Sequence, residues 1–347
     1  MAVCDFFCNF TAKYRCMAEK TRNMDKSVDA EVVHGLVVKN TGAWYTVLTD
    51  GPDGREVNCK IKGNFRLKGI RTTNPVAVGD GVTILPGVDG SAYITAIDPR
   101  KNYIIRRASN LSKEASILAA NLDMALIVAT LVHPTVSTTF IDRFLATCEA
   151  YNVPAGIVIN KTDLLVDDDN RELLEAVTYL YRSIGYPVYH VSAKDGAGVG
   201  ELHALLTGKV TLMSGNSGVG KSTLINDIIP GINLRTGEIS EAHDQGMHTT
   251  TFSEMCRLPG PEGGWLIDTP GVRGFGTLDF DEHEVSHFFP EIFKISADCR
   301  YGDCTHTHEP GCAVRRALDE SRIAQSRYAS YLSILQDDTE GKYRKPF

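Results

Sequence analysis

Residues 215–222 read Gly215-Asn216-Ser217-Gly218-Val219-Gly220-Lys221-Ser222, a complete G-x-x-x-x-G-K-S motif (a P-loop) between an apolar strand pattern and an apolar helix pattern. This strand–loop–helix setting is the one in which the motif binds phosphate. Its glycines let backbone N–H groups close around phosphate oxygens, and the helix N-terminus adds its dipole. We expect these eight residues and Thr223 to hold a nucleotide. Lys221 would bridge the β- and γ-phosphates and act in catalysis, and Ser222 would ligate Mg²⁺.

A second phosphate-side motif, Asp268-Thr269-Pro270-Gly271, follows the strand pattern Trp265–Ile267. An acidic residue at the end of such a strand can hold Mg²⁺ through water, and the glycine can contact a γ-phosphate. D-x-x-G is a weak signal alone, but on its own strand and downstream of a P-loop it becomes a strong one. We therefore expect Asp268 and Gly271 to belong to the nucleotide site.

Two further motifs predict a preference for guanine. Asn160-Lys161-Thr162-Asp163 closes the strand pattern Ala155–Ile159, and Ser192-Ala193-Lys194 ends the next strand pattern. A carboxylate at Asp163 can accept the N1–H and the N2 amino protons of guanine, whereas adenine offers no such pair. Backbone N–H groups of the second motif can reach the guanine O6, and the Ser192 hydroxyl can brace the loop. We expect six residues to bind the base: Asn160, Lys161, Asp163, Ser192, Ala193 and Lys194.

Alternating strand and helix patterns surround these motifs and indicate a parallel α/β sheet. The apolar strand patterns are Ala125–Thr130, Ala155–Ile159, Val188–Val191 and Val210–Met213, and the helix patterns between them are Ser137–Tyr151, Arg171–Ile184 and Val199–Leu206.

Residues 32–105 instead carry short strand patterns separated by turn residues. These are Val32–Lys39, Trp44–Thr49, Glu56–Ile61, Gly81–Leu85 and Tyr93–Ile97. Five strands over about 70 residues suit a small barrel such as an OB-fold. An SH3-like barrel is the alternative, which periodicity does not exclude.

A cysteine and histidine cluster near the C-terminal end predicts a metal centre. Cys299-x4-Cys304-x-His306-x5-Cys312 gathers three thiols and an imidazole within 14 residues. Such a set can surround one tetrahedral Zn²⁺, and four filled ligand positions favour a structural metal. His308 is the nearest rival ligand, and a redox cysteine cluster is the competing reading. A helical pattern, Ala313 to Leu335, follows.

Composition restricts the class of protein. The chain has 347 residues, 43% of them hydrophobic and 23% charged, which is ordinary for a globular protein. Its apolar runs are far shorter than the ~18 residues that a membrane helix needs. The N-terminus lacks the pattern of a secretory signal, and nine cysteines then indicate a reducing compartment, so we expect a cytoplasmic protein. Residues 110–298 carry 12 basic and 25 acidic side chains, so any polyanionic partner should contact the flanking segments.

The nucleotide motifs resemble those of translation-factor-type GTPases, but the guanine motifs precede the P-loop here. The chain therefore looks like a circularly permuted GTPase, in which the strand ends still converge at one edge of the sheet. Together with the barrel and C-x4-C-x-H-x5-C, this order resembles the ribosome small subunit-dependent GTPase A family of bacteria and plastids, over about residues 30–335.

The resemblance implies an α/β fold with three parts: an OB-type five-stranded barrel (30–105), a circularly permuted P-loop GTPase domain (110–280) and a zinc-binding helical domain (281–347). It favours His306 as the fourth zinc ligand. Residues 1–29 are read as a disordered tail or a start codon placed upstream of Met24. The implied function is hydrolysis of GTP during late maturation of the small ribosomal subunit. The barrel and zinc domain would contact its rRNA, with no membrane partner and a monomeric chain.

The remaining nucleotide element is Gly246-Met247-His248-Thr249-Thr250-Thr251, which resembles the switch I stretch G-x-H-T-T-T of the family. We expect Thr250 to reach Mg²⁺ and the γ-phosphate, with Thr249 as the alternative. Ras-type enzymes orient the attacking water with a glutamine after D-x-x-G, but Val272 stands there and cannot do so. His248 is the candidate for that role, brought to the water when the subunit orders its loop.

Basic residues indicate where RNA could bind. In the barrel segment they surround Phe65, which could stack on a base; they are Arg55, Lys60, Lys62, Arg66, Lys68 and Arg71. Those of the C-terminal helical pattern are Arg315, Arg316, Arg322 and Arg327. A solvated strand edge is the alternative for the first group.

Two other functions stay open: a P-loop ATPase or kinase, which the guanine motif opposes, and a non-catalytic RNA-binding module in which GTP only sets conformation.

His248→Ala should abolish the hydrolysis stimulated by the small subunit while leaving nucleotide affinity near normal. A partner that supplies or orders a catalytic group contributes up to roughly 10⁵-fold in GTPases, so the loss should be large. Single-turnover GTP hydrolysis with and without small subunits measures it. Full stimulated activity in the variant would remove His248 from the mechanism.

Overall fold

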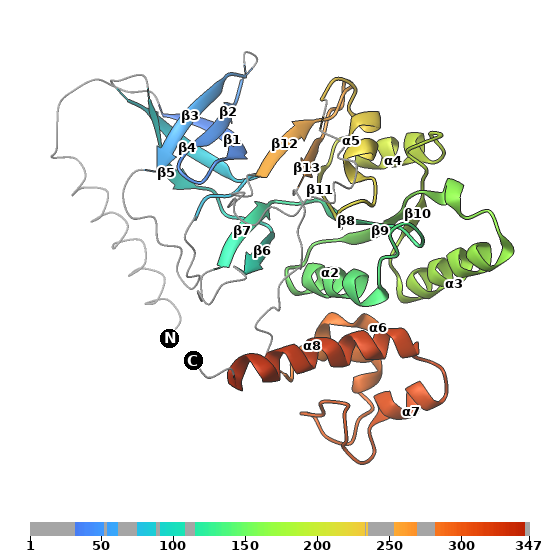
Figure 1. Cartoon of the computed structure of the whole chain (residues 1–347). Helices are drawn as coiled ribbons and strands as arrows, with labels where there is room; N and C mark the ends of the chain where they lie inside the picture. Colours follow the sequence, from blue (N-terminus) through green and yellow to red (C-terminus); the bar gives the residue numbers. More distant parts are fainter. Residues whose placement is uncertain are drawn as a thin grey trace, which may run out of the picture. The chain divides into compact units, whose positions relative to one another are not determined.

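The computed structural model describes residues 32–51, 54–61, 75–87, 91–107, 115–232, 234, 253–268 and 282–343 (Figure 1). The expected tail, residues 1–29, lies outside these ranges, and so do most of the basic residues around Phe65. Within the described residues, no helix combines the length and the apolar character that crossing a membrane requires.

Five strands form the N-terminal barrel, in agreement with the sequence patterns. They are β1 (Val33–Asn40), β2 (Tyr45–Thr49), β3 (Glu56–Ile61), β4 (Gly81–Pro86) and β5 (Ala92–Ile97). The strands pair in the order β1-β2-β3-β5-β4, and β4 returns to β1, so the ring closes. Only the β3–β5 pair is parallel. Closure through this parallel pair favours the OB-type barrel over the SH3-like alternative.

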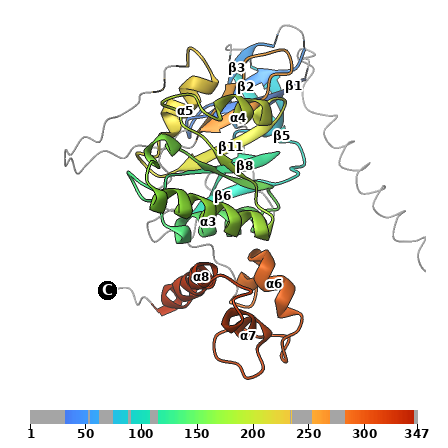
Figure 2. The same ribbon diagram turned by 90° about the vertical axis from the view of Figure 1, so that its right-hand side faces the viewer.

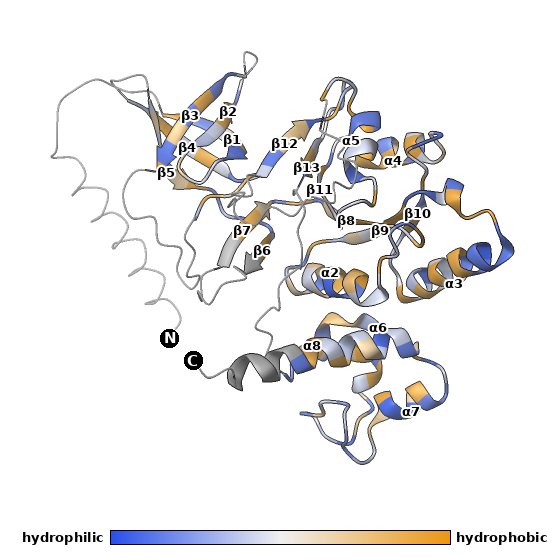
Figure 3. Ribbon diagram, viewed as in Figure 1, coloured by the Kyte–Doolittle hydropathy of each residue, from blue (hydrophilic) through white to orange (hydrophobic). Residues whose placement is uncertain are grey.

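The second body is a parallel sheet covered by helices. Its parallel strands lie in the order β10 (Val188–His190), β9 (Ala155–Ile159), β8 (Met124–Ala129), β11 (Val210–Gly215) and β13 (Trp265–Asp268). Every residue of β8 is buried, because helices cover both faces (Figure 3). The helices are α2 (Thr138–Ala150), α3 (Asp168–Ile184), α4 (Val199–Leu206), α5 (Lys221–Ile228) and the short 3₁₀ turn η1 (Thr162–Leu164).

One strand joins the barrel to this sheet. β12 (Ser253–Arg257) runs antiparallel to β13 on one side and to β1 on the other, so that a single eleven-stranded sheet results. Successive side chains of β1 enter different cores: Val37 packs in the barrel and Val38 packs among the residues of the α/β core. The sequence patterns did not indicate this sharing, because strand pairing across more than 200 residues leaves no local signature.

A two-stranded hairpin lies between the two bodies and was not predicted. It consists of β6 (Tyr103–Arg107) and β7 (Ala115–Ala120). The backbone N–H of Ala120 donates to the Val78 carbonyl at 2.9 Å, which fixes the hairpin against the barrel. Gly79 (φ +87°) permits this approach, since a Cβ there would lie 2.2 Å from the Ala120 carbonyl oxygen.

The C-terminal module contains η2 (Val285–Phe288), α6 (Pro290–Ser296), α7 (Ala313–Asp319) and α8 (Gln325–Tyr343). Figure 2 shows α6, α7 and α8 grouped together, and their side chains form a second hydrophobic core, to which Ala146 of α2 contributes. The helical stretch predicted over Ala313–Leu335 is therefore two helices. Ser321 adopts a left-handed backbone (φ +58°) between them and ends the first. Within the described residues, this module has no strand, as the sequence pattern indicated.

Candidate functional site

The P-loop connects β11 to α5 at the carboxyl edge of the sheet, as its motif predicts. Gly218 (φ +82°) and Gly220 (φ +85°) have left-handed backbone conformations that a side chain would strain. Gly215 lies against the neighbouring strand, since a Cβ there would be 2.6 Å from the Val128 carbonyl oxygen. The helix α5 begins at Lys221, inside the motif itself. The loop therefore has the backbone freedom that a phosphate cradle requires.

Strand order brings the P-loop close to Asp268, the first residue of the second motif expected to contact phosphate. β11 and β13 are parallel neighbours, with Met213 in register with Asp268. The Lys221 ammonium group forms an ion pair with the Asp268 carboxylate, and only 8% of Lys221 is exposed. The group expected to bind phosphates and the group expected to hold Mg²⁺ thus meet at one point. Ser222, beside them in α5, is half-buried.

The side chain of Asn160 holds three motifs together. Its Nδ2 donates to the carbonyl of Val219 in the P-loop at 2.8 Å, and its Oδ1 accepts from the N–H of Ala193 at 3.2 Å. Asn160 is 2% exposed, so both polar ends of a buried amide are satisfied. Gly220 faces the same amide, because a Cβ there would lie 2.5 Å from Nδ2. Any shift of one loop would leave a buried polar group unpaired.

The other guanine-motif side chains are also fixed. Asp163 Oδ1 accepts from the Ser192 hydroxyl at 2.9 Å, and the ammonium of Lys194 lies 3.8 Å from Asp163 Oδ2. Lys161 has a left-handed backbone (φ +61°), and its Nζ donates to the carbonyl of His133 at 2.7 Å. The loop that contains His133 was not singled out from the sequence. Its position directly after β8, at the same edge as the motifs, is the signal that could have found it.

Three predicted site residues lie outside the described ranges: His248, Thr250 and Gly271. Thr249, the alternative to Thr250, lies outside them as well. Their roles therefore stay predictions.

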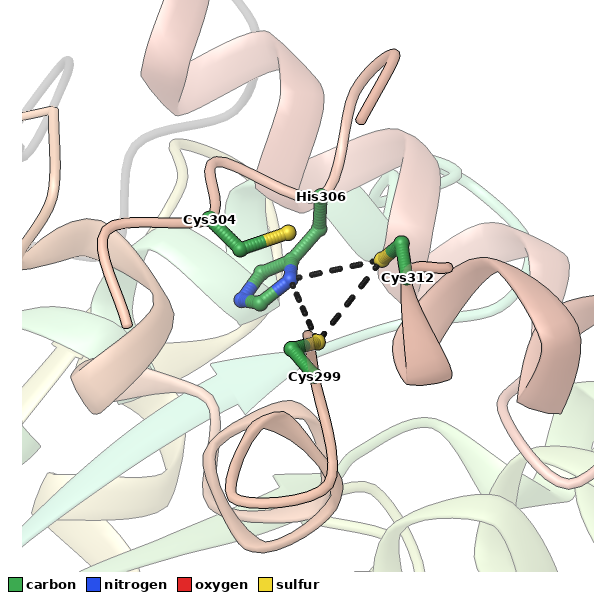
Figure 4. A group of neighbouring side chains, drawn as sticks. All are labelled: Cys299, Cys304, His306 and Cys312. Atoms are coloured by element: carbon green, nitrogen blue, oxygen red, sulfur yellow. Dashed lines mark hydrogen bonds between the residues drawn. The ribbon is translucent and has the colours of Figure 1, made fainter. Parts of the chain in front are cut away.

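The predicted zinc ligands converge in the C-terminal module (Figure 4). The ligand atoms of Cys299, Cys304, His306 and Cys312 all lie within 4.8 Å of one another. His306 Nδ1 is 3.6 Å from the sulfurs of Cys299 and Cys312, which are 3.9 Å apart. A tetrahedral zinc with bonds of ~2.3 Å to sulfur and ~2.0 Å to nitrogen would separate two sulfurs by about 3.8 Å and sulfur from nitrogen by about 3.5 Å. The four side chains therefore fit a zinc ion.

Backbone and side-chain contacts hold the cluster in this shape. Cys312 caps α7, with its sulfur accepting from the N–H of Arg315 at 3.4 Å, and the sulfur of Cys299 accepts from the N–H of Ala313 at 3.3 Å. The hydroxyls of Tyr328 and Tyr331 in α8 donate to the carbonyls of His306 and Thr305, each at 2.7 Å. N–H groups at a helix start stabilise thiolate charge, so the site suits a cation.

Two side chains in and beside the cluster have shifted pKa values. Burial raises the pKa of the Cys304 thiol to about 12, so an adjacent cation is needed to hold it as a thiolate at neutral pH. Glu309 lies beside the cluster; burial raises its pKa, but hydrogen bonds from Thr305 and nearby N–H groups outweigh that effect and lower the pKa to about 2. His308, the rival ligand, is exposed and hydrogen-bonds to Thr307 instead.

Of the four C-terminal arginines predicted to bind RNA, one is buried. Arg315, Arg316 and Arg322 are exposed, but Arg327 is 1% exposed and pairs with Asp142 and Glu291. Its guanidinium cannot reach a phosphate, and the expectation that Arg327 binds RNA is wrong. The helical spacing that suggested it does not reveal which face of α8 is covered.

Comparison with known proteins gives a match over most of the chain. A family model described as RsgA GTPase matches residues 97–278, and one described as RsgA N-terminal domain matches residues 34–94. The chain belongs to the RsgA GTPase family. A relative from Bacteroides thetaiotaomicron named small ribosomal subunit biogenesis GTPase RsgA 2 is 60% identical over 313 residues, covering 90% of this chain and 99% of the relative. A Porphyromonas gingivalis relative named small ribosomal subunit biogenesis GTPase RsgA is 58% identical over 316 residues, with the same coverage.

Two solved structures resemble the fold seen here. The crystal structure of YjeQ from Thermotoga maritima has a TM-score of 0.70 and 33% identity, covering 89% of this chain and 99% of that chain. That of YloQ, described as a circularly permuted GTPase, has a TM-score of 0.67 and 30% identity, covering 93% and 100%. The circularly permuted GTPase fold, expected from motif order, and the N-terminal five-stranded barrel, expected from the strand patterns of residues 32–105, are thereby confirmed.

Cys304→Ser should prevent the cluster from binding zinc and unfold the C-terminal module, because a structural metal contributes its binding free energy to folding. Elemental analysis of the purified chain measures zinc, and far-UV circular dichroism measures helix loss. His308→Ala, at the exposed neighbour, is the matched control and should keep one zinc per chain. A wild-type chain that contains no zinc and forms a disulfide among these cysteines would instead support the redox reading.

Proposed function

We propose that this GTPase acts as a late maturation factor of the small ribosomal subunit, binding its rRNA and being stimulated by the subunit. The observation that supports the proposal is the contact of Asn160 with both the P-loop and Ala193, because it brings the permuted motifs expected to bind guanine next to the motif expected to bind phosphate. Membership in the RsgA GTPase family supports hydrolysis of GTP, and the relatives named for small ribosomal subunit biogenesis support the partner.

In this proposal the P-loop N–H groups and Lys221 bind the β- and γ-phosphates, and Ser222, Thr250 and Asp268 hold Mg²⁺. Mg²⁺ would neutralise charge that develops on the phosphates during transfer to water. Asp163 accepts the N1–H and N2 protons of guanine, and Ser192 orients it by donating to Oδ1. The N–H of Ala193 already serves Asn160, so we assign recognition of O6 to other N–H groups of that loop, including Lys194.

Hydrolysis in this proposal depends on residues that the partner orders. Because Val272 cannot orient water, basal turnover should be slow. His248 orients the attacking water once the small subunit orders the switch I loop. The subunit then acts as the activator, in the way that partner proteins supply missing groups to other GTPases.

RNA contact in this proposal uses the outer surfaces of the barrel and of the C-terminal module. In the barrel, the Lys60 ammonium lies 4.2 Å from the ring centroid of Trp44, which is 40% exposed. An exposed aromatic ring beside a cation is the kind of surface on which an unpaired base stacks. Arg315 and Arg316 are the exposed cations of α7. The zinc ion of Cys299, Cys304, His306 and Cys312 would act only structurally, and the protein would work as a cytoplasmic monomer.

Asp163→Asn should weaken GTP binding by about 100-fold, because each hydrogen bond to a charged group contributes about 1.5–3 kcal/mol. The same change should favour xanthosine triphosphate, whose C2 carbonyl can accept from the new amide. Titration with fluorescent nucleotides measures both affinities. Asp195→Asn, at an exposed carboxylate three residues after Ser192 in the same loop, is the control and should bind GTP normally. A variant that keeps its GTP preference would remove Asp163 from base recognition.

Small ribosomal subunits should stimulate GTP turnover by the purified chain, whereas large subunits should not. Phosphate release with each isolated subunit tests this directly, and raising the salt concentration should weaken the stimulation steeply if basic residues bind rRNA. Equal stimulation by both subunits would contradict the assigned partner. GTP binding without turnover under any condition would favour the non-catalytic module.

A further inference from the structure

Helix α2 belongs to two hydrophobic cores at once. Its residues Ile141, Phe144, Leu145 and Cys148 pack in the α/β core, at the i, i+3, i+4, i+7 spacing of one helix face. Ala146, on another face, belongs to the core of the C-terminal module. The helix therefore cannot move relative to either body without disturbing packing in both.

Polar contacts anchor α2 to the C-terminal module. Arg327 of α8 donates through Nη1 to Asp142 of α2 at 2.7 Å, and through Nε to Glu291 of α6 at 2.7 Å. Arg327 and Asp142 are 1% and 0% exposed, and the hydroxyl of Tyr181 in α3 donates to the same Asp142 oxygen at 2.9 Å. Arg143 adds a contact from Nη2 to the Ser333 hydroxyl at 2.8 Å. A buried charge network of this kind tolerates little rearrangement.

The N-terminal end of α2 reaches the nucleotide motifs. The helix starts after Ser137, whose hydroxyl caps it by accepting from the N–H of Phe140 at 3.3 Å. The loop before Ser137 contains His133, whose carbonyl accepts from Lys161 of the guanine motif at 2.7 Å. In the same loop the Pro134 ring lies beside the P-loop, 3.6 Å from the place that a Cβ would occupy at Gly218.

The loop between β8 and α2 is short and internally hydrogen-bonded, so we expect it to move together with α2. Its Val136 N–H donates to the Thr130 carbonyl at 3.0 Å, and the Thr130 hydroxyl donates back to the Pro134 carbonyl at 2.5 Å. These bonds link the end of β8 to the start of α2 across six residues. Displacement of α2 would therefore shift the His133 carbonyl away from Lys161.

We propose that α2 couples the C-terminal module to the guanine site, with Arg327 as the positioning residue that acts on Lys161 through Asp142 and the His133 carbonyl. The inference rests on the proposed binding of guanine nucleotide. A nucleotide that fixes Lys161 favours one position of α2, and the module docked on that helix shares the preference. Because coupling is reciprocal, contacts of the module with a partner change nucleotide affinity by the same factor that nucleotide changes those contacts.

Asp142→Asn in the full chain tests the coupling, since the amide retains shape and an acceptor for Tyr181 but removes the charge that holds Arg327. We expect GDP affinity to fall about tenfold, within the range of ordinary coupling between sites. The zinc content should stay at one per chain. Asp168→Asn removes the charge of an exposed ion pair with Arg171 and is the matched control, which should bind GDP like the wild type.

Hydrogen exchange on the wild-type chain gives a second test that needs no variant. Addition of GDP should slow amide exchange in α2 and in residues 325–335 of α8, and Asp142→Asn should remove the effect on α8 alone. The coupling is overturned if GDP binds the wild type and slows exchange in the P-loop but leaves α8 unchanged. It is also overturned if Asp142→Asn and Asp168→Asn bind GDP equally. A wild-type chain that does not bind GDP would overturn the proposed function and the coupling together, and so differs from both results.

Discussion

The buried amide of Asn160 is the constraint on which the nucleotide site depends. It is enclosed where the loops after β9, β10 and β11 meet, and Val219 and Ala193 satisfy its two polar ends. A buried amide that lost either partner would cost on the order of 1–3 kcal/mol. The three loops therefore have one favoured arrangement, whatever their order along the chain. That is why a permuted sequence can assemble the same site: strand order in the sheet, and not sequence order, decides which loops meet.

Sharing of elements connects this site to the rest of the molecule. β1 contributes Val37 to the barrel core and Val38 to the α/β core, and α2 contributes Phe144 to the α/β core and Ala146 to the core of the C-terminal module. Each shared element therefore packs in the cores of two neighbouring parts. The Arg327 network fixes how the C-terminal module packs on α2. The buried guanidinium is paired only where the carboxylates of both Asp142 and Glu291 reach it. The three parts are thus joined through their interiors.

Local signals in the sequence predicted the elements well, and long-range contacts account for what they missed. β3, β9 and α4 begin and end where the patterns indicated, because alternation, apolar runs and glycine turns are encoded within each segment. The Cys3His spacing likewise located a cluster that closes within 14 residues. By contrast, the β1–β12 pairing and the hairpin β6–β7 depend on partners outside the local pattern. Arg327 resembled an exposed basic residue for the same reason: its acidic partners, Asp142 and Glu291, lie 185 and 36 residues away.

The pairing of β1 with β12 also has a consequence for biosynthesis. Lys39 faces Glu254 across this pair, so one strand leaves the ribosome long before its neighbour exists. At about 5–20 residues per second, the intervening stretch of chain takes roughly 10–40 s to make. During that interval the barrel can close through the pairing of β4 with β1. The side of β1 that carries Val38 still lacks the α/β core against which it packs in the folded protein. The P-loop strand β11 is likewise made after β8 but before β13, and must wait for its second neighbour. Permutation thus makes the nucleotide-binding half of the sheet one of the last parts of the nascent chain to be completed.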